Sequence, residues 1–209
     1  MFPIEVVAAY LAAVLVVVIA PGPDNLLAIS RGLSQGRRAA ALSSVGAGLG
    51  IMVHTLAATL GLALVLQTSP VAFWVVKSVG ATYLLWLGYQ AMTSRNLISF
   101  APAGKQPFSR IFLTGLFSNV LNPKPGLFVV AFIPQFVSAD RGPVPTQMLV
   151  YGAIFAALTA ITFTLLGIFS ARLSRWLSHR PRVVAAANIG AGLTFVAAGF
   201  SVLALGRPK

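Results

Sequence analysis

Two pairs of prolines, each with one residue between them, interrupt long apolar segments of this sequence. Pro21-Gly22-Pro23 follows the apolar run 14–20, and Pro123-Lys124-Pro125 precedes the apolar run 126–130. Proline removes a backbone donor and clashes with the preceding turn, so each pair predicts an interrupted helix. Within a bilayer, the freed backbone groups are tolerated only where protein or a water-filled cavity satisfies them. A matched pair of broken helices in the two halves of a chain therefore indicates a transporter's binding site.

Composition places the chain in a membrane. Of 209 residues, 57% are hydrophobic and 9% are charged, against about 25% charged in soluble proteins. The net charge of +12 comes mostly from bases in short loops, which indicates membrane topology and contact with anionic lipid rather than with nucleic acid. The chain has no cysteine, which excludes disulfides and thiolate metal sites. We expect no metal and no cofactor.

Six apolar stretches are long enough to cross a bilayer as helices. They cover residues 4–33, 39–66, 70–92, 108–137, 147–171 and 183–205. The first and the fourth contain the proline pairs. The sequence therefore predicts an all-α membrane protein with six transmembrane helices, of which helices 1 and 4 are broken at Pro-x-Pro.

The loop charges predict how these helices are oriented. Ten bases lie in loops on one side of the predicted membrane and three on the other, which places the first set in the cytoplasm and both termini outside. Because each half has three spans, the halves have opposite orientations, and segment 80–89 is similar to segment 192–200. We predict a 3+3 inverted repeat that forms one transmembrane domain. Residues 1–93 form the first repeat, 94–107 a cytoplasmic linker and 108–209 the second repeat.

Asp24 is the only carboxylate predicted to lie inside the membrane. Proline favours the first helical position, so a helix is expected to start at Pro23, with Asp24 in its first turn. A charge at this depth costs about 2.5–3.5 kcal/mol on the insertion scale and indicates a function. Two interpretations remain open: Asp24 takes up a proton or holds a substrate ammonium, or it caps a helix at the cytoplasmic interface.

Lys124 is the corresponding charge in the second interrupted segment, and Asn119 and Asn122 lie near it. Its position near the middle of a predicted span suits binding of a substrate carboxylate or a structural pair with Asp24. We expect the second helix to restart after Pro125, so that two positive helix ends face one cavity and favour an anionic group. The predicted site residues are Pro21, Gly22, Pro23, Asp24, Asn25, His54, Asn119, Asn122, Pro123, Lys124 and Pro125.

Two further features have alternative interpretations. His54, midway along the second span, either relays protons or is a hydrogen-bonded packing residue. Small residues at 46–50 and at 152–160 indicate either tight packing within one chain or a sliding or homodimer surface.

Several motifs occur together in one order along the chain. They are the segments 21–25 (PGPDN), 30–36 (SRGLSQG), 77–88 (KSVGATYLLWLG), 108–124 and 132–136 (FIPQF). In these motifs, over nearly its whole length, the chain resembles the lysine exporter / homoserine–threonine resistance (LysE/RhtB) family of bacterial amino-acid exporters.

The resemblance implies a transporter rather than an enzyme. It implies a six-helix inner-membrane exporter, driven by the proton-motive force, that exchanges protons for amino acids or related small metabolites. The family's Pro-Gly-Pro and Asn-Pro-Lys motifs map onto residues 21–23 and 122–124. Pro125 departs from the small residue often found there, and the fifth span lacks the acid that some members carry. A passive small-solute channel and a membrane scaffold subunit without transport remain alternatives.

Overall fold

The described part of the chain is helical throughout. The structure is a computed structural model that describes residues 2–20, 22–68, 70–93, 106–172, 176 and 179–204. Its α-helices are α1 (Ile4–Ile19), α2 (Pro23–Gln35), α3 (Arg37–Thr68), α4 (Pro70–Thr93), α5 (Phe108–Val120), α6 (Pro123–Phe132), α7 (Val144–Ile168) and α9 (Pro181–Ala204). Two 3₁₀ turns, η1 (Ile133–Phe136) and η2 (Ala139–Arg141), follow α6. Pro21, most of the predicted linker 94–107 and residues 205–209 lie outside the described residues.

The helices are those of a multi-pass membrane protein. Among the described residues, Arg37–Gly61 and Val144–Ile168 are each long and apolar enough to cross a membrane alone. Two bent pairs meet the same requirement jointly: α1 with α2, bent by 63°, and α5 with α6 and η1, bent by 51°. The helices α4 and α9 have 24 residues each. The count of six spans and the inverted repeat remain predictions.

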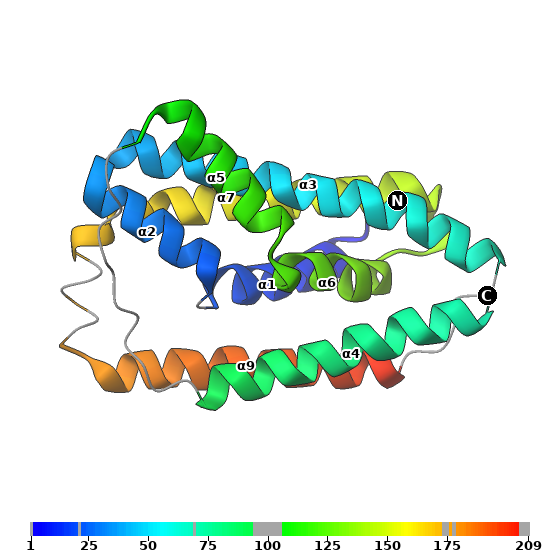
Figure 1. Cartoon of the computed structure of the whole chain (residues 1–209). Coiled ribbons are helices and arrows are strands. Elements are labelled where there is room, and N and C mark those ends of the chain that lie inside the picture. The colour runs from blue at the N-terminus through cyan, green and yellow to red at the C-terminus, as the bar shows by residue number, and fades with distance from the viewer. Residues whose placement is uncertain are drawn as a thin grey trace.

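The helices form three layers (Figure 1). One layer contains α3, α5 and α7, with α2 packed on α3 and α7. A second layer is the pair α4 and α9, which pack mainly on each other. The short helices α1 and α6 lie between these layers: α1 contacts α7 and α9, and α6 contacts α3 and α4.

Glycines bring the helix backbones into direct contact. A Cβ built at Gly115 would meet the Ser43 carbonyl oxygen of α3, and one built at Gly88 would lie 2.8 Å from the Gly192 carbonyl oxygen of α9. Gly48 likewise lies against α7, where a Cβ would be 2.9 Å from the Ala156 carbonyl oxygen. Small residues therefore serve close packing within the chain at these crossings. A homodimer remains a prediction.

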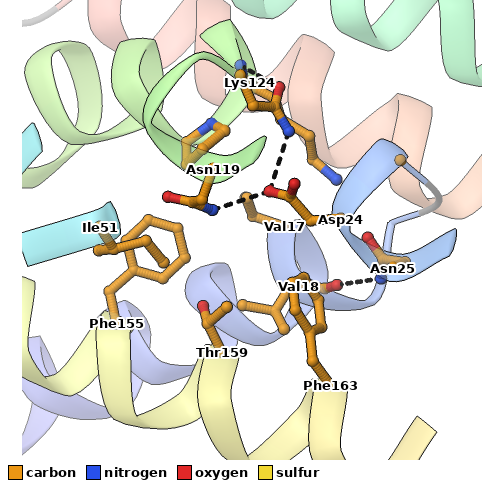
Figure 2. A pocket seen from close by; sticks show the side chains of 13 residues that line it. Val17, Val18, Asp24, Asn25, Ile51, Asn119, Lys124, Phe155, Thr159 and Phe163 are labelled. Carbon is orange, nitrogen blue, oxygen red and sulfur yellow. Dashed lines mark hydrogen bonds between the residues drawn. The ribbon is translucent and has the colours of Figure 1, made fainter. Parts of the chain in front are cut away.

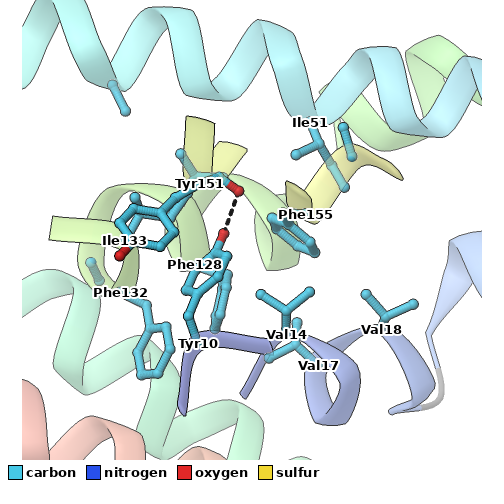
Figure 3. Packing of buried hydrophobic residues seen from close by; sticks show 14 of the residues in the cluster. Tyr10, Val14, Val17, Val18, Ile51, Phe128, Phe132, Ile133, Tyr151 and Phe155 are labelled. Atoms are coloured by element: carbon cyan, nitrogen blue, oxygen red, sulfur yellow. Dashed lines mark hydrogen bonds between the residues drawn. The ribbon is translucent and has the colours of Figure 1, made fainter. Parts of the chain in front are cut away.

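A cluster of aromatic side chains joins the helices α1, α6 and α7 (Figure 3). The Tyr10 hydroxyl of α1 donates a hydrogen bond of 2.6 Å to the Tyr151 carbonyl of α7. The rings of Phe128 in α6 and Phe155 in α7 meet edge to face, with centroids 5.2 Å apart. Because this core ties α1, α6 and α7 together, it fixes the ends of the broken helices that surround the candidate site.

Candidate functional site

The first helix break lies between Ile19 and Pro23. As expected, Pro23 is the first residue of α2, and Gly22 is its N-cap. The Asn25 Nδ2 donates a hydrogen bond of 2.7 Å to the Val18 carbonyl near the end of α1. The last carbonyls of a helix have no partner within it, so Asn25 replaces one of the bonds that the break removes.

The second helix break lies at Leu121 and Asn122, earlier than predicted. The helix α6 begins at Pro123, so the expectation that it restarts after Pro125 is wrong. Asn122 is the N-cap, and its Oδ1 accepts a hydrogen bond of 3.0 Å from the Lys124 backbone N–H. Both prolines fall in the first turn of α6, where the helix needs no backbone donor.

Asp24 is held by residues of the second break. Its carboxylate accepts hydrogen bonds from Ser118 Oγ (2.8 Å), from Asn119 Nδ2 (2.8 Å) and from Asn122 Nδ2 (3.1 Å). The side chain is only 6% exposed. A charge at the start of α2 is thus stabilised by three neutral donors from around the end of α5, about a hundred residues away in the sequence.

Lys124 makes the reciprocal connection to the first break. Its Nζ donates a hydrogen bond of 2.7 Å to the Ala20 carbonyl at the end of α1. It also lies 5.9 Å from the centroid of the Phe195 ring of α9. Among the described residues, Asp24 and Lys124 form no salt bridge with each other. Since an ammonium has three donors, Lys124 has capacity to bind a further acceptor.

His54 stabilises the second break from α3. Its Nε2 lies 3.1 Å from the Asn119 carbonyl oxygen at the end of α5. This contact is that of a hydrogen-bonded packing residue, and the proton-relay role stays a prediction. Gly126 of α6 lies against the imidazole, since a Cβ there would be 2.8 Å from His54 Cε1.

A small cavity lies where the two breaks meet. Its volume is about 20 Å³. Its lining comes from α1, α2, α3, α5, α6 and α7 and includes Gly22, Asp24, Asn25, Asn119, Asn122, Lys124 and Pro125, together with Val17, Val18, Ile51, Phe155, Thr159 and Phe163. Pockets for small organic ligands measure about 300–1,000 Å³, whereas one water needs roughly 10–15 Å³. The space at the site is therefore large enough for a water molecule but not for an amino acid.

The structure brings most predicted site residues to this cavity and adds two. Pro23, His54 and Pro123 are not part of its lining, and Pro21 lies outside the described residues. Ser118, which binds Asp24, and Thr159, which lines the cavity, were not predicted. Ser118 directly precedes the predicted Asn119, but nothing in the sequence distinguishes Thr159 from other threonines. The described residues contain no group of three or more side chains suited to a metal ion.

A separate polar cluster joins the far ends of α2 and α5. The Arg31 guanidinium, 2% exposed, donates to Gln35 Oε1 (3.1 Å) and to Gln106 Oε1 (2.8 Å). Gln35 Nε2 donates to the Gln106 carbonyl (2.8 Å). A cation is therefore held by neutral amides, and it ties α2 to the residue that precedes α5 by two positions.

Comparison with known proteins adds a family and relatives. The family model described as LysE type translocator matches residues 15–206. The chain is 30% identical over 189 residues to a leucine efflux protein of Enterobacter sp. (strain 638), covering 90% of each chain. It is 30% identical over 192 residues to a homoserine/homoserine lactone efflux protein of Salmonella typhi, covering 91% of this chain and 92% of that one. An uncharacterized membrane protein of Vibrio cholerae is 30% identical over 197 residues, which cover 94% of this chain and 95% of that one. No solved structure matches the chain.

Proposed function

The chain belongs to the LysE type translocator family, and from this premise we propose that it exports small amino acids or related metabolites in exchange for protons. The relatives named for leucine efflux and for homoserine or homoserine lactone efflux support an amino-acid-like substrate. We propose the bacterial inner membrane as its location. The bases Arg31, Arg37, Arg38 and Arg110 lie where α2 meets α3 and where α5 begins, which supports a cytoplasmic position for that end, both termini outside and contact with anionic lipid.

The observation that carries the proposal is that the charged residue of each helix break is bound by groups of the other break. Asp24 of the first break is bound by Ser118, Asn119 and Asn122, and Lys124 of the second is bound to the Ala20 carbonyl. In the proposed complex, Lys124 binds the substrate carboxylate, and Asp24 holds either the substrate ammonium or the exchanged proton. An amino acid has complementary charges for both groups, and the helix ends at the cavity add partial charges of their own.

The small size of the cavity supports alternating access rather than a passive channel. A space of about 20 Å³ has no room for an amino acid, so the helices have to separate before substrate enters. The breaks provide places to bend, because their backbone bonds are already made by side chains such as Asn25 and His54. The strongly packed pairs α3 with α7 and α4 with α9 each join a helix to its counterpart in the other proposed repeat, so in this proposal the two pairs move against each other.

Transport by the purified protein in proteoliposomes tests the proposal. We expect uptake of labelled neutral amino acids to be faster when the vesicle interior is more acidic than the outside, because protons then leave as the amino acid enters. Asp24→Asn should lose this acceleration, because an amide side chain does not bind and release protons. Asp140→Asn in the exposed turn η2 should keep it. Flux that follows only the amino-acid gradient would favour the passive channel, and unchanged pH dependence in Asp24→Asn would remove Asp24 from coupling. Absence of any flux would favour the scaffold.

A further inference from the structure

Two polar atoms at the cavity have no hydrogen-bond partner among the described residues. They are Thr159 Oγ1 and Asn119 Oδ1. Both residues are 1% exposed and both line the same cavity. Figure 2 shows Thr159 extending from α7 into the cavity, with Asn119 opposite it. Buried polar groups are nearly always hydrogen-bonded, and leaving one unpaired is unfavourable. The two atoms therefore indicate an occupant that supplies the missing bonds.

Thr159 differs from the other buried threonines. Thr55 and Thr59 in α3 donate to the carbonyls four residues earlier, at 2.8 and 2.7 Å. This bond within the helix is available to a threonine on α7 as well, yet the Thr159 hydroxyl does not make it. Its hydroxyl thus remains available to the cavity as both a donor and an acceptor.

The orientation of Asn119 is set by its other contact. Its Nδ2 donates to Asp24 Oδ2 at 2.8 Å, which leaves the Oδ1 as an acceptor only. A hydroxyl group can donate to Oδ1 and also exchange a hydrogen bond with the Thr159 hydroxyl. A methyl group can do neither, so the pair distinguishes two side chains of equal shape.

The surroundings of this pair select a neutral side chain. The other lining groups nearby are apolar: Val17, Val18, Ile51, Phe155 and Phe163. The charged groups Asp24 and Lys124 belong to the polar part of the cavity, where a substrate's amino and carboxylate groups bind in the proposed function. A second charge on the substrate would have no counter-charge among the apolar residues and would lose its hydration.

We propose that Thr159 Oγ1 and Asn119 Oδ1 form the side-chain subsite of this transporter and recognise a hydroxyl group on the substrate's aliphatic side chain. The inference rests on the proposed function, since it assumes that an amino acid occupies the cavity. Thr159 is then the residue that determines whether a hydroxylated amino acid is preferred over its aliphatic isostere. A site that hydrogen-bonds a substrate hydroxyl rejects the analogue without it, because its own polar groups are then left unpaired.

Counterflow in proteoliposomes with threonine and valine tests the subsite, because these substrates differ only by a hydroxyl and a methyl group. Counterflow needs no proton gradient, so the result does not depend on the coupling ion. The wild-type protein should prefer threonine, and Thr159→Val should lower the threonine/valine ratio by about fivefold to tenfold. Thr159→Ser should retain most of the preference. Homoserine and norvaline form a second isosteric pair and should show the same change.

Thr59→Val is the matched control, since it makes the same substitution at a threonine whose hydroxyl is bonded within α3. It should leave the substrate ratio unchanged. Thermal unfolding in detergent adds a second readout. Thr159→Val should be at least as stable as wild type because it removes an unpaired hydroxyl, whereas Thr59→Val should be less stable.

Three outcomes overturn the subsite. An unchanged ratio in a transporting Thr159→Val protein would show that the hydroxyl does not recognise the side chain. Equal loss of threonine and valine counterflow in a folded variant would assign the hydroxyl to a bridging water or to a group common to both substrates. A wild-type protein that moves neither amino acid would remove the proposed function, and this subsite with it.

Discussion

The two ends of the molecule are packed differently on the layer formed by α4 and α9. At one end, α1 contacts both α7 and α9, and α6 contacts both α3 and α4, so these half-helices bridge the two outer layers. At the other end, α2 packs on α3, α5 and α7, and α5 packs mainly on α3. Neither α2 nor α5 packs extensively on α4 or α9 among the described residues. The site lies between a bridged end and an end without such bridging helices.

This difference suggests how the two states of the proposed transport cycle differ. In the proposed inverted repeat, the counterpart of the α1–α9 contact is an α5–α4 contact, and the counterpart of the α6–α4 contact is an α2–α9 contact. In the structure, the α1–α9 and α6–α4 contacts are the larger ones, and their counterparts α5–α4 and α2–α9 are minor among the described residues. The proposed second state exchanges them, and it closes the α2 and α5 end while the α1 and α6 end separates. In the proposed topology, the end without bridging helices is the cytoplasmic end.

The largest expected effect concerns Lys124, which connects the two breaks at the site. Lys124→Ala leaves the Ala20 carbonyl without its donor and the buried Asp24 without a nearby positive charge. Removing one buried charge of an interacting set costs about 3–5 kcal/mol, so counterflow should fall by at least about a hundredfold. Lys124→Arg should restore little of the counterflow, because there is no room for the larger guanidinium. The Lys124 Nζ already lies 3.3 Å from where a Cβ at Gly22 would be. Full transport by Lys124→Ala would contradict a role for the connection.

The next effect concerns the contact between α6 and α3. Gly126→Ala places a methyl group 2.8 Å from His54 Cε1 and should lower the free energy of unfolding by about 1–3 kcal/mol. Thermal unfolding in detergent measures this change. Gly61→Ala is the control, because a Cβ at Gly61 meets nothing within 4 Å. Adding His54→Ala should relieve the clash, so the double variant should lose less than the sum of the two single losses. Equal stability of the two alanine variants would contradict close packing of α6 on α3.

The smallest effect concerns the end without bridging helices, where Arg31 ties α2 to Gln106. Arg31→Lys replaces a planar fork by a single ammonium that cannot hold Gln35 and Gln106 in the same geometry. Loss of one hydrogen bond to a charged group costs about 1.5 kcal/mol or more, so amide exchange in α2 should accelerate by about tenfold. The exposed Arg38→Lys should leave exchange unchanged. If both variants exchange at the wild-type rate, the Arg31 cluster does not hold this end.

The sequence predicted the helices well because proline, charge and apolar length are local signals. The predicted span 39–66 corresponds to α3 (Arg37–Thr68), and 70–92 corresponds to α4 (Pro70–Thr93). The restart of α6 was placed two residues late because a helix that begins at Pro123 accommodates a second proline in its first turn.

The site could be predicted only in part. Asp24, Lys124, Asn119 and Asn122 were predicted to lie near one another, but their partners were not. The bond from Lys124 to the Ala20 carbonyl requires knowing that the ammonium reaches the opposite break. Thr159 could not be identified because a helical threonine usually bonds to its own helix, and only the packing of α7 shows that this one does not. The roles of these residues remain proposals.

The measurement that tests the account most directly is labelling of a single cysteine in the cavity. The chain has no cysteine of its own, so Val18→Cys introduces a unique thiol at a cavity residue that is 3% exposed. Val14→Cys, one turn earlier in α1 and 0% exposed, is the control within the core (Figure 3). A membrane-impermeant maleimide applied from each side of oriented vesicles reports which end is open.

We predict that Val18→Cys is labelled from the cytoplasmic side at rest and from the outside under a gradient that favours the opposite state, and that substrate slows both reactions. Val14→Cys should not react from either side. A transporting Val18→Cys protein whose thiol is never labelled from either side, or is labelled at a rate that substrate does not change, would contradict a substrate path between the two helix breaks.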